Sequence, residues 1–204
     1  MQARDRILGV SEKLFLKHGA RKITMDDIAL DAGISKKTLY QHFDDKHALI
    51  FQVTKGLLLR IEAQIDYCSK HSNNAVDEMI QLMECTSEVF RNINPIMLFD
   101  LHDHFPRSWK LYQKHKKTYL QMSVASNIKR GIREKLYRSD IDPDIVAMIR
   151  LAQMDSLFNA EMMPIKKNDF LKLREQTTMM FLHGLLSDQG RDMLRSYKRI
   201  KLNE

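Results

Sequence analysis

Five polar side chains gather within seven positions near the N-terminus of this sequence. They are Lys36, Lys37, Thr38, Tyr40 and His42. Ammonium, hydroxyl and imidazole groups are the groups that bind the phosphates and the base edges of nucleic acids. No Ser or Cys is accompanied by the base and orienting partner that a nucleophile requires, and the sequence has no Gly-rich phosphate loop. We therefore expect a binding protein and not an enzyme.

The residues around this cluster predict two short helices joined by a tight turn. Thr24 is the predicted N-cap of the first helix, and Asp27 stands three positions later, where a capping box has its acid. Gly33 suits a sharp turn that requires a positive φ angle. Ser35 is the predicted N-cap of the second helix. Two short helices with a glycine in the turn have the layout of a helix-turn-helix.

The outer face of the second helix has two interpretations. The interior of such a unit requires apolar side chains, here Ile28, Ala29, Ile34 and Leu39. The five polar side chains then remain outside. An ordinary solvated surface explains the lysines, but it explains less well the exposed Tyr40 beside them. A helix in the major groove of DNA explains the whole set, because its residues contact base edges and phosphates. We favour DNA binding.

The composition permits a polyanionic partner. The formal net charge is +7 over 204 residues. Residues 1–60 contain 11 Lys and Arg against 7 Asp and Glu, a net charge of +4, so positive charge is denser at the N-terminus. We find no signal peptide and no apolar run of about 18 residues, and we expect a cytoplasmic protein without a membrane partner.

The pattern of the whole chain predicts an all-α fold. The 7 Gly and 4 Pro are few, and no Asn-Gly or Asp-Gly dipeptide marks a hairpin. We expect an N-terminal helix-turn-helix domain of three helices at 1–47 and a larger helical domain at 48–204, with a connecting helix at about 46–68. The other predicted helices are 3–18, 24–31, 35–43, 76–91, 96–104, 108–137, 143–162 and 168–187, and a basic tail helix follows a break at "SDQG", 187–190.

A metal site is the weakest of the alternatives. Asp100 and His104 lie on one face of a predicted helix, but zinc requires three or four protein ligands. Cys68 and Cys85 match no metal-ligand spacing, and we expect both to be free thiols. We expect no metal and no cofactor.

Residues 4–51 resemble the N-terminal domain of the TetR family of bacterial transcriptional repressors. The likeness includes Phe15, Gly19, Thr24, "IA" at 28–29, "AGIS" at 32–35 and "TLYQHF" at 38–43, followed by Lys46. It implies a set of eight DNA-binding residues. Phosphates are assigned to Thr24, Tyr40, His42 and Lys46, bases to Lys36, Lys37 and Thr38, and Ser35 completes the set. Many family members have Gly where Lys37 stands, so the sequence departs from the pattern there.

The rest of the chain resembles the family in layout only. That layout implies a cavity for a small effector among the middle helices and pairing of the last two long helices with a second copy of the chain. The expected effector-binding residues are Met83, Phe90, Phe99, His102, Tyr119 and Met122. The expected dimer stripes are Ile145, Ile149, Ala152, Ser156 and Ala160 on helix 143–162, and Leu171, Thr178, Leu182 and Leu185 on helix 168–187. The alternatives are a collapsed core without ligand and stripes that close the core of a single chain.

These expectations combine into one function. We expect a homodimeric repressor that binds double-stranded operator DNA and is released by a small hydrophobic or amphipathic effector. The alternative is a helical protein-interaction module that binds neither DNA nor ligand, which would not require the lysine and tyrosine face.

Overall fold

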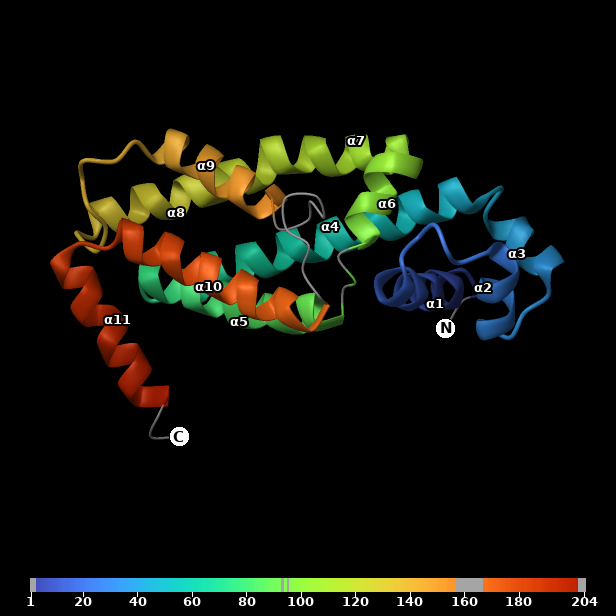
Figure 1. Ribbon diagram of the computed structural model, residues 1–204, viewed down its shortest axis with the longest axis horizontal. Coiled ribbons are helices and arrows are strands. Elements are labelled where there is room, and N and C mark those ends of the chain that lie inside the picture. Colours follow the sequence, from blue (N-terminus) through green and yellow to red (C-terminus); the bar gives the residue numbers. More distant parts are fainter. Residues whose placement is uncertain (1–2, 93, 95, 157–166, 202–204) are drawn as a thin grey trace. The chain divides into compact units, whose positions relative to one another are not determined.

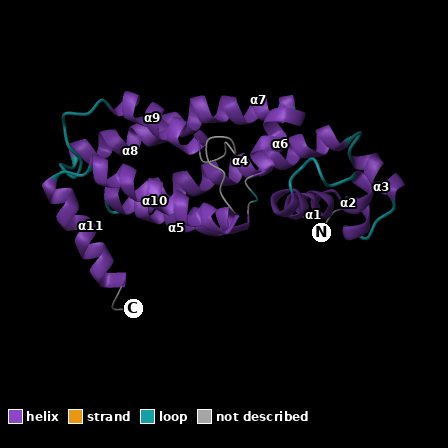
Figure 2. Ribbon diagram, in the orientation of Figure 1, coloured by secondary structure: helices purple, strands orange, loops and turns teal. Residues whose placement is uncertain are grey.

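A computed structural model describes residues 3–92, 94, 96–156 and 167–201 (Figure 1). Within these ranges the chain forms helices and connecting turns, with no strand, as Figure 2 shows. An isolated antiparallel bridge joins Tyr137 and Leu186. The predicted all-α fold class, with an N-terminal helix-turn-helix and a larger helical part, is confirmed. In the part of the chain that the structure describes, no helix is both long and apolar enough to span a membrane.

The helices follow the predicted order along the chain. Their bounds are α1 Ala3–His18, α2 Met25–Asp31, α3 Lys36–His42, α4 Lys46–His71, α5 Ala75–Asn92, α6 Ile96–His104, α7 Pro106–His115, a π-helical turn η1 Lys116–Leu120, α8 Gln121–Arg133, α9 Pro143–Ser156, α10 Lys167–Leu185 and α11 Asp188–Lys201. The predicted extension of α9 to residue 162 lies outside the described residues.

The chain divides into two compact units. Unit 1 comprises residues 1–61 and 89–115, and unit 2 comprises residues 62–88 and 116–204. The apolar core of unit 1 joins the three N-terminal helices to α4 and α6. Its buried side chains include Phe15, Ile28, Leu39, Leu49, Met97 and Leu101. The helix-turn-helix is therefore held by α6 as well as by its own helices.

Unit 2 has a separate apolar core. Its buried members are Ala75, Val76, Ile128, Leu136, Tyr137, Leu182, Leu185, Leu186 and Leu194. Helix α8 packs along α9 in this unit (Figure 1). The core therefore takes residues from α5, α8, α10 and α11 and from the turn after α8.

The predicted dimer stripe on α10 is wrong for three of its four residues, whereas Leu171 is only partly buried. Leu182 and Leu185 are buried in the core of unit 2, and Thr178 is buried as well. A helical apolar stripe alone does not show which surface it covers, and here it closes the core of one chain. The predicted stripe on α9 differs, because Ile145 and Ile149 are exposed in the single chain. Ala160 lies outside the described residues.

The single helix predicted at 108–137 is interrupted once and ends before residue 137. A π-helical turn separates α7 from α8, and α8 ends at Arg133. The chain turns back at Lys135, whose φ angle is +61°, and the amides of Leu136 and Tyr137 donate to the Gly131 carbonyl. The ring of Tyr137 then packs on Gly131, where a Cβ atom would lie 2.2 Å from it. The buried Tyr137 ends the helix.

The break predicted at "SDQG" is shorter in the structure. Helix α10 ends at Leu185 and α11 begins at Asp188, so Asp188, Gln189 and Gly190 belong to the first turn of α11. Gly190 is required by packing, because a Cβ atom there would lie 2.0 Å from the Leu136 carbonyl oxygen. The glycine marks a close backbone approach and not a loop.

Candidate nucleic-acid interface

Helix α2 begins with the predicted capping box. The Thr24 hydroxyl accepts a hydrogen bond from the Asp27 amide at 3.1 Å, and the Thr24 amide donates to the Asp27 carboxylate at 2.8 Å. The backbone hydrogen bond from Thr24 is the main cause that lowers the pKa of Asp27. The box fixes where the helix starts, and Thr24 itself remains exposed.

The turn between α2 and α3 has the conformation that its glycine predicts. Gly33 has a φ angle of +59°, and a Cβ atom there would lie 2.8 Å from a guanidinium nitrogen of Arg6. The guanidinium of Arg4 lies 5.5 Å from the centroid of the Phe43 ring. Two cations of α1 therefore lie beside the turn and the end of α3. Sequence reasoning missed them, because only the tertiary packing of α1 brings them there.

Helix α3 is capped by Ser35. Its hydroxyl accepts from the Thr38 amide at 3.0 Å and lies 2.8 Å from the Thr38 hydroxyl. Lys36 forms an exposed ion pair with Asp26 of α2 at 2.7 Å, and the hydrogen bond to that carboxylate raises the lysine pKa. Ser35 and Thr38 thus hold the start of the helix, and Lys36 has a local partner. An exposed pair of this kind is weak enough to open for a stronger anion.

One face of α3 is buried and the other is exposed to solvent. Leu39 is fully buried, and Phe43, directly after the helix, is buried as well. Lys37, Tyr40 and His42 are each exposed, and Tyr40 keeps 42% of its surface exposed. The helix therefore exposes a cation and a phenol on one face and an imidazole at its end.

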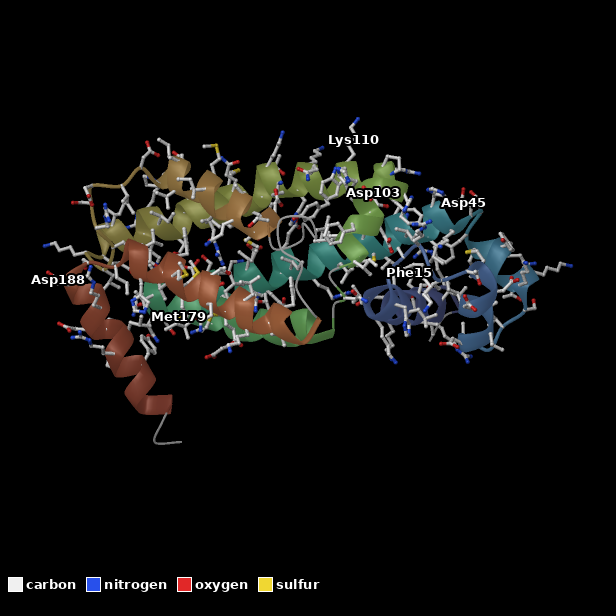
Figure 3. All side chains as sticks on the ribbon, viewed as in Figure 1. Phe15, Asp45, Asp103, Lys110, Met179 and Asp188 are labelled. Carbon is white, nitrogen blue, oxygen red and sulfur yellow. The ribbon has the colours of Figure 1, made fainter. Side chains whose placement is uncertain are left out.

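Lys46 has an internal role at the start of α4. Its ammonium donates to the Arg21 carbonyl at 2.9 Å and lies 5.7 Å from the centroid of the Phe105 ring. Partial burial is the main cause that lowers its pKa. Asp45, labelled at the start of α4 in Figure 3, accepts from the Ala48 amide at 2.7 Å and caps the helix. Lys46 thus ties the loop before α2 to α4, and phosphate binding by Lys46 stays a prediction.

The loop before α2 is also anchored from α6. The amide of Arg21 donates to the buried carboxylate of Asp100 at 2.8 Å. From the sequence we considered Asp100 only as a metal ligand. No local pattern indicates its hydrogen bond to Arg21, which lies 79 positions earlier in the chain. In the structure Asp100 positions the segment that leads into the helix-turn-helix.

Residues 7–53 match the family model described as "Bacterial regulatory proteins, tetR family". These residues cover most of α1, all of α2 and α3 and the start of α4. Over these residues the chain is similar to the tetR family of bacterial regulatory proteins. The matched segment coincides with the helix-turn-helix and with the parts of α1 and α4 beside it.

Curated relatives are similar to the chain mainly in this segment. The HTH-type transcriptional repressor KstR2 of Rhodococcus jostii is 38% identical over 55 residues, which is 27% of each protein. Other curated relatives also match over only 29% and 23% of their lengths. Two solved structures share the fold. The ketosteroid regulator KstR2 of Mycobacterium tuberculosis has a TM-score of 0.65 at 19% identity, and the match covers 92% of this chain and 96% of that one. A SmeT–triclosan complex has a TM-score of 0.67 at 18% identity, and the match covers 91% of this chain and 92% of that one.

The effector-binding residues predicted from the sequence are divided between the two units. Phe99 and His102 belong to α6 in unit 1, and Phe90 belongs to the part of α5 in unit 1, where its side chain is outside the described part of the chain. Met83, Tyr119 and Met122 belong to unit 2. Tyr119 donates to the Asp66 carboxylate at 2.5 Å, and burial raises its pKa. Met122 is 71% exposed. Their shared role stays a prediction.

Proposed function

We propose that this protein is a DNA-binding transcriptional repressor that acts as a homodimer and leaves its operator when a small amphipathic molecule binds. The observation that carries the proposal is the exposed face of α3. Lys37 and Tyr40, three positions apart, share this face, and Leu39 is buried in the core. His42 is exposed at the end of the same helix. The set of Thr24, Ser35, Lys36, Lys37, Thr38, Tyr40, His42 and Lys46 is the proposed contact surface for DNA.

The side chains on this face suit a polyanion better than a protein partner. A protein-binding helix usually offers an apolar stripe to a groove. Here the exposed positions carry a cation, a phenol and an imidazole, which bind phosphate oxygens and base edges. Arg4 and Arg6 add positive charge beside the turn and the end of α3. This surface favours a regulator over the protein-interaction module.

Dimerisation follows from the size of an operator. One seven-residue helix reaches only a few base pairs, and two-fold dimers read two half-sites about one helical turn apart. Helix α9 carries an exposed apolar stripe, formed by Ile145, Met148, Ile149 and Ala152 at helical spacing. Met180 on α10 is 68% exposed, and Gly184 one turn later has open space around it. These residues replace Leu182 and Leu185 in the proposed interface.

The effector part of the proposal has separate support. SmeT, which shares the fold of this chain, has been solved in complex with the small molecule triclosan. Helix α4 contributes residues to both units and is our candidate for the element that transmits effector binding. A ligand shifts DNA affinity only if it prefers one of two arrangements of the protein. The effector of this chain must therefore bind the DNA-free arrangement more tightly than the DNA-bound one.

Fluorescence anisotropy with DNA from the region upstream of the protein's own gene tests the proposal. We expect one duplex to bind about 10³-fold or more tightly than a scrambled duplex, as specific sites do. We also expect a stoichiometry of two chains per site and a log affinity that falls steeply with log salt concentration. Equal and weak binding to both duplexes by a folded dimer would favour the protein-interaction module.

A further inference from the structure

Helix α9 carries a buried arginine that the DNA-binding proposal does not use. Arg150 is only 8% exposed. Its guanidinium donates to Gln153 Oε1 at 2.7 Å, to Thr178 Oγ1 at 2.7 Å and to the Thr177 carbonyl at 3.4 Å. It also lies 5.0 Å from the centroid of the Phe181 ring. Every one of these partners is neutral, and within the described ranges no carboxylate pairs with Arg150.

A second guanidinium lies in the same part of unit 2. Arg174 of α10 donates to the hydroxyl of Thr86 on α5. Burial lowers the pKa of Arg150 to about 10, and the positive charge of Arg174 acts in the same direction. Burial likewise lowers the pKa of Arg174 to about 10. Helices α5, α9 and α10 therefore enclose two cations that repel each other.

This arrangement costs stability in the chain without a ligand. A charge removed from water is normally paired with an opposite charge, because neutral hydrogen-bond partners do not replace its hydration fully. Arg150 has neutral partners only, and the charged neighbour that affects its pKa is another cation. Costs of this kind concentrate at functional sites, where a ligand removes them.

We propose that Arg150 and Arg174 form a subsite for the anionic head group, a carboxylate or a phosphate, of an amphipathic effector. The proposal rests on the effector-responsive function proposed above and specifies the charge of the effector. A guanidinium has five donors in a planar fork that matches two oxygens of an oxyanion. The hydroxyl of Thr178 accepts from Arg150 and donates to the Arg174 carbonyl, and it therefore holds the Arg150 guanidinium beside α10.

The same helices offer apolar surface for the rest of such a molecule. Val146 of α9 and Met179 and Phe181 of α10 are only partly buried, and all three pack against the core of unit 2. Figure 3 labels Met179 on α10, the helix that also carries Arg174. Methionine adapts to irregular shapes, which suits a flexible hydrocarbon. A buried cation beside partly open apolar side chains predicts an acid with a hydrophobic tail.

Four twelve-carbon probes with different head groups test the charge requirement. They are laurate, dodecyl phosphate, dodecanol and dodecyltrimethylammonium. The three charged probes are used below their micellar concentrations and dodecanol below its solubility limit, all with the full-length protein. We expect at least one anionic probe to raise the melting temperature and to bind saturably in calorimetric titrations, because ligands of the native state stabilise it. The two anionic probes distinguish a carboxylate site from a phosphate site. The proposal is overturned if neither anion binds more tightly than dodecanol.

Matched arginine variants locate the site. Arg150→Gln should weaken the binding of the anionic probe roughly 10- to 100-fold, as loss of a charge-assisted hydrogen bond does. Arg133→Gln, which removes an exposed guanidinium from α8, should leave it unchanged. Arg174→Gln provides a second variant if Arg150→Gln folds poorly. Probe affinity that is equal in the wild type and both subsite variants would overturn the proposal.

A stability measurement separates a ligand subsite from a structural arginine. Without any probe, Arg150→Met should melt at the same temperature as the wild type or higher, because the variant no longer buries an unpaired charge. A structural role predicts a clear decrease in the melting temperature.

Operator binding without probe distinguishes the two proposals. If the wild type binds an anionic probe but no operator, the DNA-binding function is rejected. If the wild type binds operator but no anionic probe, only the subsite is rejected.

Discussion

At the scale of single residues, the loop before α2 depends on Gly19 and Asp100. Gly19 ends α1 with a φ angle of +85°, and a Cβ atom there would lie 2.7 Å from the Asp100 carboxylate and 2.8 Å from Ile96. The same carboxylate accepts from the Arg21 amide. Helix α6 therefore approaches the loop closely only because residue 19 has no side chain. The start of α2 is positioned by this contact.

Gly19→Ala should lower the free energy of unfolding by about 1–3 kcal/mol. The substitution forces alanine into the left-handed region and against Asp100, and both effects destabilise the native state. Gly9→Ala is the matched control, because Gly9 lies inside α1 with nothing within 4 Å of a Cβ atom. This control should gain about 0.5–1 kcal/mol. Urea denaturation measures both. A Gly19→Ala protein as stable as Gly9→Ala would contradict the tight approach of α6.

At the scale of elements, the helix-turn-helix was predictable because its determinants are local. The Thr24 and Asp27 capping box, Gly33 in the turn and Ser35 at the next N-cap lie within twelve positions, and each has the predicted conformation. The end of α8 was not predictable. Its left-handed residue is Lys135, without a glycine to indicate it, and Tyr137 ends the helix through tertiary contacts.

The same difference explains the error on α10. The stripe of Thr178, Leu182 and Leu185 has the spacing of an interface, but spacing does not identify the surface that covers it. Lys46 shows a related limit at the proposed DNA surface. Its bond to the Arg21 carbonyl joins residues 25 positions apart, and no sequence pattern indicated it.

At the scale of the whole molecule, the proposed function requires two copies of the chain. The exposed stripe of α9 supplies the surface, since its Ile149 is 57% exposed in the single chain. Exposed apolar side chains at helical spacing are typical of an interface. Burying such a stripe against a second copy stabilises the dimer by about 25 cal/mol for each Å² of apolar surface.

Ile149→Glu should convert the dimer into a folded monomer. The glutamate would have to lose its hydration in the interface without a cationic partner, which costs several kcal/mol. Met122→Glu is the matched control, because it places the same charge at an exposed methionine of α8. This control should remain dimeric. Sedimentation velocity measures both, and a dimer that survives Ile149→Glu would move the interface away from α9.

The operator affinity of Lys37→Ala compared with that of Lys110→Ala tests most directly whether α3 contacts DNA. Both substitutions remove one exposed lysine from unit 1, from α3 in one case and from α7 in the other. Anisotropy titrations on the upstream duplex should show at least about tenfold weaker binding for Lys37→Ala, since the dimer loses two contacts of about 1 kcal/mol or more each. Lys110→Ala should bind within about twofold of the wild type, because a single exposed charge outside the interface acts only through screened, long-range attraction. Wild-type affinity for Lys37→Ala, or equal losses for both variants, would contradict the assignment of α3 as the DNA-binding helix.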